Sequence, residues 1–202
     1  MRTIFVVLCA AITPCFAHGA TTIFADNFNT DAAGLNATPS GWTISNGGTV
    51  DTIASGSFGI TCAGATGRCI DLDGSTGKSG NLTSPGFSLV AGQTYTASFD
   101  LSGNQRASGQ TDVVSVSFGT TTTSVSVLGS AAFSTHSVSL MPAANGIFHL
   151  SFLDNSSNNV GAILDNVNVQ TTAIPEPETF AMLLAGLGLA GVAARWRRVK
   201  QH

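Results

Sequence analysis

The chain is short of charge, and the charges it has are mostly of one kind. Charged residues make up 9% of its 202 residues, and its only glutamates are Glu176 and Glu178. Between residues 18 and 173, nine aspartates stand against Arg68, Lys78 and Arg106, which leaves a formal charge of −6 with histidine neutral. We do not expect nucleic acid as a partner, because phosphate binding needs clustered lysine and arginine.

The sequence also lacks the residue patterns of common hydrolases. Glycoside hydrolases use paired carboxylates, and the missing glutamate removes the commonest acid of that class. No serine lies in a Gly-x-Ser-x-Gly elbow. His136 and His149 are expected on outward strand positions without a catalytic partner. We therefore predict no catalytic residue and no enzymatic activity, with a polysaccharide hydrolase as the least favoured alternative.

The N-terminal segment has the three parts of a secretory signal peptide. Met1 and Arg2 are followed by an apolar run at residues 4–12 (IFVVLCAAI), and residues 15–17 (CFA) precede a suitable cleavage point. We expect cleavage after Ala17, with Gly19 as the second choice, so that residues 1–17 are removed on export.

The C-terminal segment predicts one short membrane-spanning helix. Residues 179–194 (TFAMLLAGLGLAGVAA) carry no charge and lack the polar face of a soluble amphipathic helix. As a helix they would extend about 24 Å, against a hydrocarbon layer of about 30 Å, so bilayer thinning or snorkelling would have to close the gap. Residues 195–202 form a basic tail that marks the cytoplasmic side. A buried C-terminal helix is the alternative.

Three features stand in a fixed order around this span: a Pro-Glu-Pro box, the span itself and an arginine cluster. The box and the cluster consist of Pro175, Glu176, Pro177, Arg195, Arg197 and Arg198. This order resembles the PEP-CTERM sorting signal of Gram-negative bacteria. The resemblance implies that a membrane protease of the exosortase type recognises the box within the linker 172–178 and that the tail is removed. It further implies transient anchoring in the inner membrane, followed by release to the cell surface or an extracellular polysaccharide matrix.

Only two cysteines remain in the predicted mature chain. Cys62 and Cys69 lie in a glycine-rich turn (TCAGATGRC) between two expected strands. We predict a disulfide between them, because an exported protein meets an oxidising compartment. A zinc site would need two further ligands nearby, and the local sequence supplies none.

The segment between the two ends predicts an all-β fold. Polar and apolar residues alternate in runs such as residues 95–101 (YTASFDL) and 114–118 (VSVSF), and turn sequences separate the runs. This alternation is typical of antiparallel sheets with one buried and one wet face. We predict one domain over residues 21–171, an antiparallel, jelly-roll-like β-sandwich.

Longer runs in this domain resemble galactose-binding-like jelly rolls and extracellular carbohydrate-binding modules. They are CIDLDGSTGKSGNLTSPGFSL from residue 69, YTASFDLSGNQR from residue 95 and ILDNVNV from residue 163. The resemblance covers most of residues 24–169. It implies a β-sandwich body and a structural calcium ion near the first and last strands.

Strand phase suggests the calcium ligands. Asp26 falls on an expected core-facing position of the first strand, and Asp165 falls in phase with Val167 and Val169 in the last. A buried carboxylate is costly unless it is hydrogen-bonded, paired or bound to a cation, and calcium prefers oxygen ligands. We hypothesise a Ca²⁺ site at Asp26 and Asp165. The alternative is that both carboxylates accept backbone N–H groups at turns.

A second acidic run, residues 71–77 (DLDGSTG), begins like a calcium loop. An EF-hand loop needs a glutamate at its twelfth position, where this chain has Leu82. We therefore interpret the run as a turn held by aspartate side chains.

A sugar-binding surface would need an aromatic platform, and the body has one tryptophan and one tyrosine. Tyr95 is in phase with the core. Trp42 is the candidate platform, with core packing as its alternative. The sequence therefore leaves two main hypotheses: a non-enzymatic surface or matrix protein, or a lectin-like module that binds exopolysaccharide.

Overall fold

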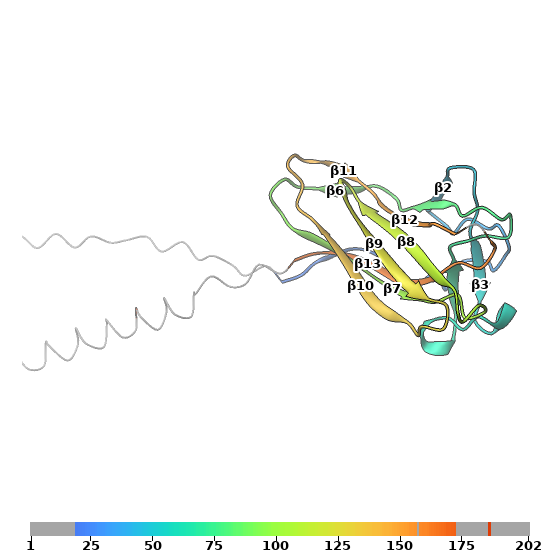
Figure 1. The fold of residues 1–202 in the computed structure, drawn as a ribbon. Helices are drawn as coiled ribbons and strands as arrows, with labels where there is room; N and C mark the ends of the chain where they lie inside the picture. The colour runs from blue at the N-terminus through green and yellow to red at the C-terminus, as the bar shows by residue number, and fades with distance from the viewer. Residues whose placement is uncertain (1–18, 157, 173–185, 187–202) are drawn as a thin grey trace, which may run out of the picture. The chain divides into compact units, whose positions relative to one another are not determined.

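The computed structural model describes residues 19–156, 158–172 and 186, and its compact body spans Ala20–Thr172 (Figure 1). The body is an all-β sandwich, which confirms the predicted fold class. Its described strands are β1 (Thr22–Asp26), β2 (Thr43–Ser45), β3 (Asp51–Ala54), β4 (Arg68–Asp71), β5 (Asn81–Thr83), β6 (Phe87–Leu89), β7 (Tyr95–Ser102), β8 (Thr111–Phe118), β9 (Thr121–Leu128), β10 (Ser134–Leu140), β11 (Gly146–Phe148), β12 (Leu150–Asp154) and β13 (Ile163–Thr171). Two 3-10 turns, η1 (Ser57–Gly59) and η2 (Ala63–Ala65), connect β3 to β4.

Two antiparallel sheets enclose the main core. The first has the strand order β10-β7-β13-β4-β3, with β1 also paired to β13. The second has the order β2-β5-β12-β8-β9, and β6 and β11 form a separate two-stranded ribbon. The first and last strands are therefore neighbours, and Asp26 pairs with Val167.

The alternation in the sequence places the core residues. Along β7 every second side chain from Tyr95 to Leu101 is buried, and β8 buries Val114, Val116 and Phe118 in the same way. Serine and threonine occupy most of the intervening positions of these two strands. Apolar side chains of the two sheets therefore meet between them and hold the sandwich together.

A smaller apolar cluster lies around the turns η1 and η2. It consists of Ile53, Ile60, Cys62, Cys69 and Ile163. Cys62 and Cys69 are joined by a disulfide, with their Cα atoms 5.4 Å apart, which confirms the predicted pairing. The bond closes the loop that carries η2 onto strand β4.

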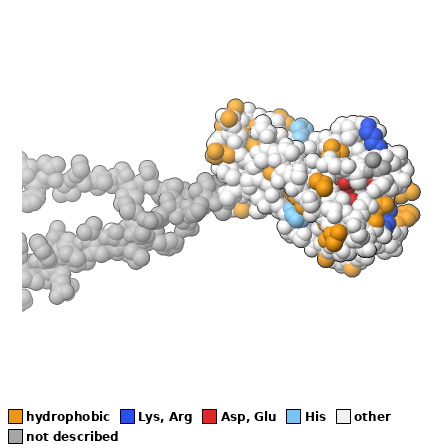
Figure 2. Space-filling view, viewed as in Figure 1, with side chains coloured by type: hydrophobic (Ala, Val, Ile, Leu, Met, Phe, Trp, Pro, Cys, Tyr) orange, Lys and Arg blue, Asp and Glu red, His pale blue; other side chains and the backbone are white. Residues whose placement is uncertain are grey.

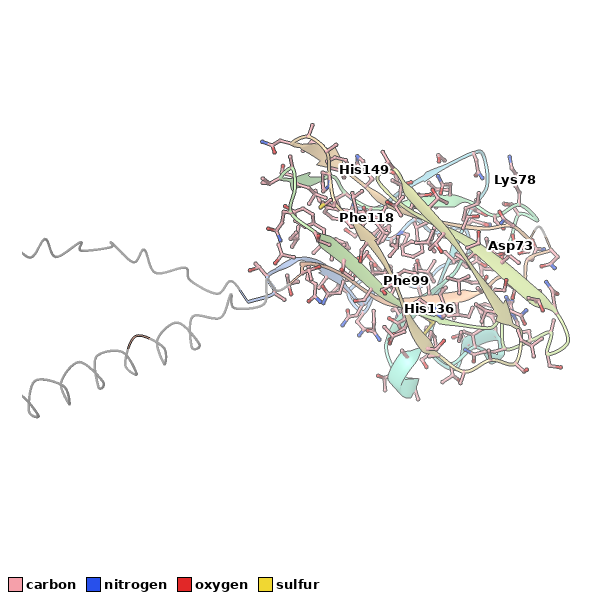
Figure 3. All side chains as sticks on the ribbon, turned by 60° about the vertical axis from the view of Figure 1, so that its left-hand side comes forward. Asp73, Lys78, Phe99, Phe118, His136 and His149 are labelled. Atoms are coloured by element: carbon pink, nitrogen blue, oxygen red, sulfur yellow. A yellow bond between two sulfur atoms is a disulfide. The ribbon has the colours of Figure 1, made fainter. Side chains whose placement is uncertain are left out.

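The position of His136 differs from the sequence prediction. Within β10 it shares its phase with the buried Val138 and Leu140, and it pairs across the strands with Phe99. Its ring stacks on the Phe99 ring with centroids 6.1 Å apart (Figure 3). The predicted outward position is wrong for His136, because alternation counted from Val138 places it on the inner face. His149 is exposed, as expected.

The last strand contains a bulge that strand phase does not reveal. The register between β13 and β7 shifts between Asp165 and Asn168, and Asn166 has a φ of 50°. One extra residue reverses the alternation, so Val167 and Val169 join the main core while Asp165 pairs across the sheet with Asp100. The expectation that Asp165 shares a face with Val167 and Val169 is therefore wrong.

The predicted terminal segments lie largely outside the described residues. This applies to the signal peptide 1–17, to the sorting residues 175–177 and 195–198, and to the span 179–194 except Gly186. No helix among the described residues is long and apolar enough to cross a membrane.

Candidate functional site

An oxygen-rich pocket lies where β1 meets the bulge of β13. It has a volume of about 400 Å³, and its lining residues are Ala25, Asp26, Asn27, Thr30, Asn166, Val167 and Asn168. The side-chain oxygen of Asn168 is buried and has no hydrogen-bond donor in the described structure. An unsatisfied buried acceptor is unfavourable, so this oxygen is able to accept a further hydrogen bond or to ligate a cation.

Asp26 is held in this pocket by two donors. Its Oδ1 accepts a hydrogen bond from Phe28 N at 2.8 Å, and its Oδ2 accepts one from Trp42 Nε1 at 2.8 Å. Each carboxylate oxygen has a further lone pair, so these contacts leave Asp26 able to bind a cation. The bond from Phe28 N is also the kind of backbone contact that the alternative to a metal site describes.

Asp165 lies on the other side of the bulge and does not line the pocket. Its oxygens accept hydrogen bonds from Asn166 N at 2.8 Å and Ala63 N at 3.1 Å. Burial raises the pKa of the Asp165 carboxyl to about 6, these two bonds oppose the rise, and the nearby charges of Asp100 and Asp26 add to it. Asp26 and Asp165 thus interact through charge without lining a common pocket.

Trp42 lies in the core with only 5% of its surface exposed. Its indole packs against Phe24, Phe28 and Phe152, with ring centroids 5.7 to 6.2 Å apart. This is the position that the core-packing alternative describes, and it offers no free ring face on which a sugar would stack.

A second polar region, which sequence reasoning missed, is a buried aspartate network. Its members are Asp51, Asp71, Asp73, Asp112 and Asp154, all at most 4% exposed. Figure 3 shows Asp73 far from His149, toward the opposite end of the sandwich. Arg106 forms an ion pair with Asp71 and is the only cation in a described salt bridge.

Backbone and amide donors satisfy most of the network. Asp73 Oδ2 accepts from Ser156 Oγ, Asn158 N and Asn159 N at 2.7 to 3.1 Å, whereas the buried Asp73 Oδ1 has no partner in the described structure. Asn104 donates to Asp112 at 2.8 Å. The run 71–77 is a turn held by an aspartate, as predicted, because Asp73 N donates to Asp71 Oδ1 at 3.1 Å.

The network has too little positive charge for its carboxylates. Burial raises the pKa of Asp71 to about 7, although the adjacent Arg106 guanidinium and two backbone donors lower it. Burial also raises the pKa values of Asp112 and Asp154 above their ordinary value. In the sequence, only the alternating aspartates Asp71 and Asp73 pointed to this network. Its members on other strands lie far away along the chain and form no recognisable pattern with them.

Neither region presents a preformed metal-ligand cluster. Within the described residues, no three histidine, cysteine, aspartate or glutamate side chains are grouped so that they would hold a metal ion. A cation at either place would therefore depend on amide and backbone oxygens in addition to carboxylates.

Comparison with solved structures identifies proteins of similar fold. A xylan-binding CBM22-1 domain of Paenibacillus barcinonensis Xyn10C has 11% identity and a TM-score of 0.53, over 79% of this chain and 99% of that one. The CBM22-1–CBM22-2 tandem of the same enzyme has 13% identity and a TM-score of 0.52, over 82% of this chain and 49% of that one. A cyclase from Fischerella sp. TAU has 14% identity and a TM-score of 0.55, over 77% of this chain and 98% of that one.

These likenesses establish the sandwich fold, and the predicted resemblance to carbohydrate-binding modules is confirmed at that level. They do not fix an activity, because a binding module and an enzyme share the fold. No curated protein matches the chain.

The C-terminal segment gives the remaining comparison. Residues 173–198 match the family described as the PEP-CTERM protein-sorting motif, which confirms the resemblance drawn from the Pro-Glu-Pro box, the span and the arginines. The motif implies export and a surface or extracellular destination. The chain is therefore a β-sandwich protein that carries a PEP-CTERM protein-sorting motif at residues 173–198.

Proposed function

We propose that this chain is a non-enzymatic surface or extracellular-matrix protein that an exosortase-type protease sorts through its tail. The match of the sorting motif to residues 173–198 carries the proposal. In this scheme the tail holds the exported body at the inner membrane until cleavage near the Pro-Glu-Pro box releases it. The body then acts by adhesion or by filling the matrix, without turnover of a substrate.

Replacement of Glu176 tests the sorting step. Cells that express Glu176→Ala should accumulate the full-length, signal-processed protein in the membrane fraction, whereas wild-type cells should contain the trimmed form outside. Glu178→Ala is the matched control, because it removes an equal charge directly after the box and should be trimmed normally. Equal trimming of both variants would show that the box is not read as proposed.

A second candidate function is exopolysaccharide binding, which the sandwich fold shared with a xylan-binding domain favours. Trp42 is buried, so the platform must be another ring. Phe58 in η1 is 61% exposed, and its backbone has a φ of 53° and a ψ of 22°. A bulky residue in this left-handed region costs about 1–3 kcal/mol, and such strain is concentrated at functional positions.

Affinity electrophoresis of the released body in gels that contain the cell's own polysaccharide tests this candidate. Phe58→Ala should abolish retardation, and Leu128→Ala, which removes another exposed apolar side chain, should not. If the wild-type body migrates freely in these gels, exopolysaccharide binding is rejected and the first candidate stands.

A structural calcium ion remains part of the proposal. Asp26 and the unsatisfied oxygen of Asn168 would supply ligands in the pocket between β1 and β13, and Asp165 would add negative charge from across the bulge. The ion would tie the first strand to the last. At a free concentration of about 100 times its Kd, it would stabilise the body by about 2.7 kcal/mol.

Thermal melts with and without millimolar Ca²⁺ test the ion. The wild-type melting temperature should rise with Ca²⁺, and the rise should be lost in Asn168→Ala and in Asp26→Asn. No rise in the wild type would dispose of the site.

A further inference from the structure

The charged residues of the body are segregated along its length. Residues 79–99, 113–153 and 166–172 contain no aspartate, glutamate, lysine or arginine. These stretches include β6, β10, β11 and the ends of β7, β8 and β13 that lie nearest to Thr172. Figure 2 shows the charged side chains gathered toward the other end of the body. The end where strand β13 finishes is therefore uncharged.

Three large apolar side chains project from this uncharged end. Val90, Met141 and Ile147 are 58%, 65% and 63% exposed, and we call them the apolar tip. Ile147 pairs with Ser88, so Val90, two residues further, lies diagonally across the same face of the ribbon. Gly92 N donates to Pro142 O at 2.9 Å and Ala91 N to Asn145 Oδ1 at 2.8 Å, which joins the three segments into one tip.

The chain leaves the body beside this tip. Thr172 N donates to Thr94 O at 2.9 Å, only four residues after Val90. Residues 173–178 then separate the body from the predicted span, and six residues reach at most about 20 Å even when extended. While the tail is anchored, a linker of this length would let the tip reach the surface of the bilayer.

We propose that the apolar tip of Val90, Met141 and Ile147 inserts into the headgroup region of the membrane that holds the C-terminal span. This inference rests on the proposed anchoring of the tail. Contact at a second point would fix the body upright, with the Pro-Glu-Pro box at the membrane surface where a membrane protease would reach it. Three side chains bind weakly alone, but the tether supplies a high effective concentration, and cleavage of the tail removes it.

The charge distribution lets the tip approach a lipid surface. A body of charge −6 would be repelled by an anionic bilayer, and screening at physiological salt acts over about 8 Å. The strand β7 alone, at eight residues, separates its two ends by about 25 Å. Carboxylates at the far end are thus several screening lengths away, and the uncharged tip meets the surface without repulsion.

The test uses the full-length, signal-processed chain in proteoliposomes that contain no other protein. An environment-sensitive fluorophore is attached at Ile147→Cys, with Leu128→Cys as the matched control, because Leu128 is also exposed but pairs with Thr111 at the charged end. Flotation and carbonate extraction first report whether the tail is anchored. Lipids brominated near the headgroup should then quench the label at position 147 at least threefold more than the label at position 128.

A second variant guards against labelling artefacts. Adding Val90→Asp and Met141→Asp to the variant labelled at position 147 should reduce its quenching to the level at position 128, while flotation is unchanged.

If the chain floats but the two labels are quenched equally, the tip does not touch lipid and this inference fails while the anchor stands. If the chain does not float, the anchor itself fails and the inference with it. A blue shift of the label at position 147 on addition of an exosortase, without quenching by the brominated lipids, would assign the tip to a protein partner and overturn the lipid proposal.

Discussion

Asp71→Asn tests whether the buried aspartate network makes this protein less stable as the pH rises. Asp71 is buried, and its pKa of about 7 in the folded protein compares with 3.8 for the free side chain. The folded state therefore holds a proton that the unfolded state releases between these two values. The stability that this proton supplies is complete at low pH and is lost as the pH rises through 7, the reverse of ordinary acid denaturation.

The size of the effect follows from the shift. Each pKa unit corresponds to about 1.4 kcal/mol. Between pH 5 and about pH 7, an interval of about two units, the folded protein holds the proton on Asp71 and the unfolded chain does not, so stability falls with pH. Above about pH 7 both states have lost the proton, and Asp71 causes no further change. Asp71 alone should therefore lower the free energy of unfolding by about 3 kcal/mol over this interval. For a domain of this size that corresponds to a fall in melting temperature of about 6–12 °C. Asp112 and Asp154, whose pKa values are also raised, act in the same direction.

Urea unfolding of the released body at pH 5, 6, 7 and 8 measures this slope. Asp71→Asn should flatten most of it, because the residue no longer titrates. Asp31→Asn is the control: Asp31 accepts a hydrogen bond from Ser40 N at 2.9 Å and takes no part in the network. Arg106→Gln should extend the loss of stability above pH 7, since the guanidinium that lowers the pKa of Asp71 is gone. A wild-type stability that is flat or rises from pH 5 to pH 8 would refute the argument.

Three further substitutions probe the fold. Replacing Cys62 and Cys69 by serine should lower the free energy of unfolding by about 2–3 kcal/mol, because the loop closed by a disulfide with a sequence separation of seven would no longer restrict the unfolded chain. Added reductant should have no effect on the stability of this variant. Trp42→Phe should cost about 1.5–3 kcal/mol in a denaturant titration, because Asp26 loses the indole donor, and should leave any polysaccharide binding intact. Gly161→Ala should destabilise the body more than Gly109→Ala does. A Cβ at position 161 would lie 2.4 Å from Asp73 N, whereas a Cβ at position 109 would meet open space. Equal melting temperatures of the two variants would contradict this.

The sequence by itself determined what depends on neighbouring residues. Alternation along residues 95–101 and 114–118 set which side chains of β7 and β8 face the core, because successive strand residues point to opposite faces. The order of the Pro-Glu-Pro box, the span and the arginines identified the sorting motif without any structure. Two cysteines seven residues apart in an exported chain were enough to predict their disulfide.

Only the tertiary structure decided features that depend on how distant segments meet. The bulge in β13 is a matter of register against β7, and one extra residue moved Asp165 out of phase with Val167. The aspartate network joins Asp71 to Arg106 and Asp73 to Asn158, pairs that lie 35 and 85 residues apart and leave no local pattern. The apolar tip likewise forms because three separate segments end at the same edge of the sandwich. Local periodicity sets which face a side chain occupies, but it does not set which strands end together.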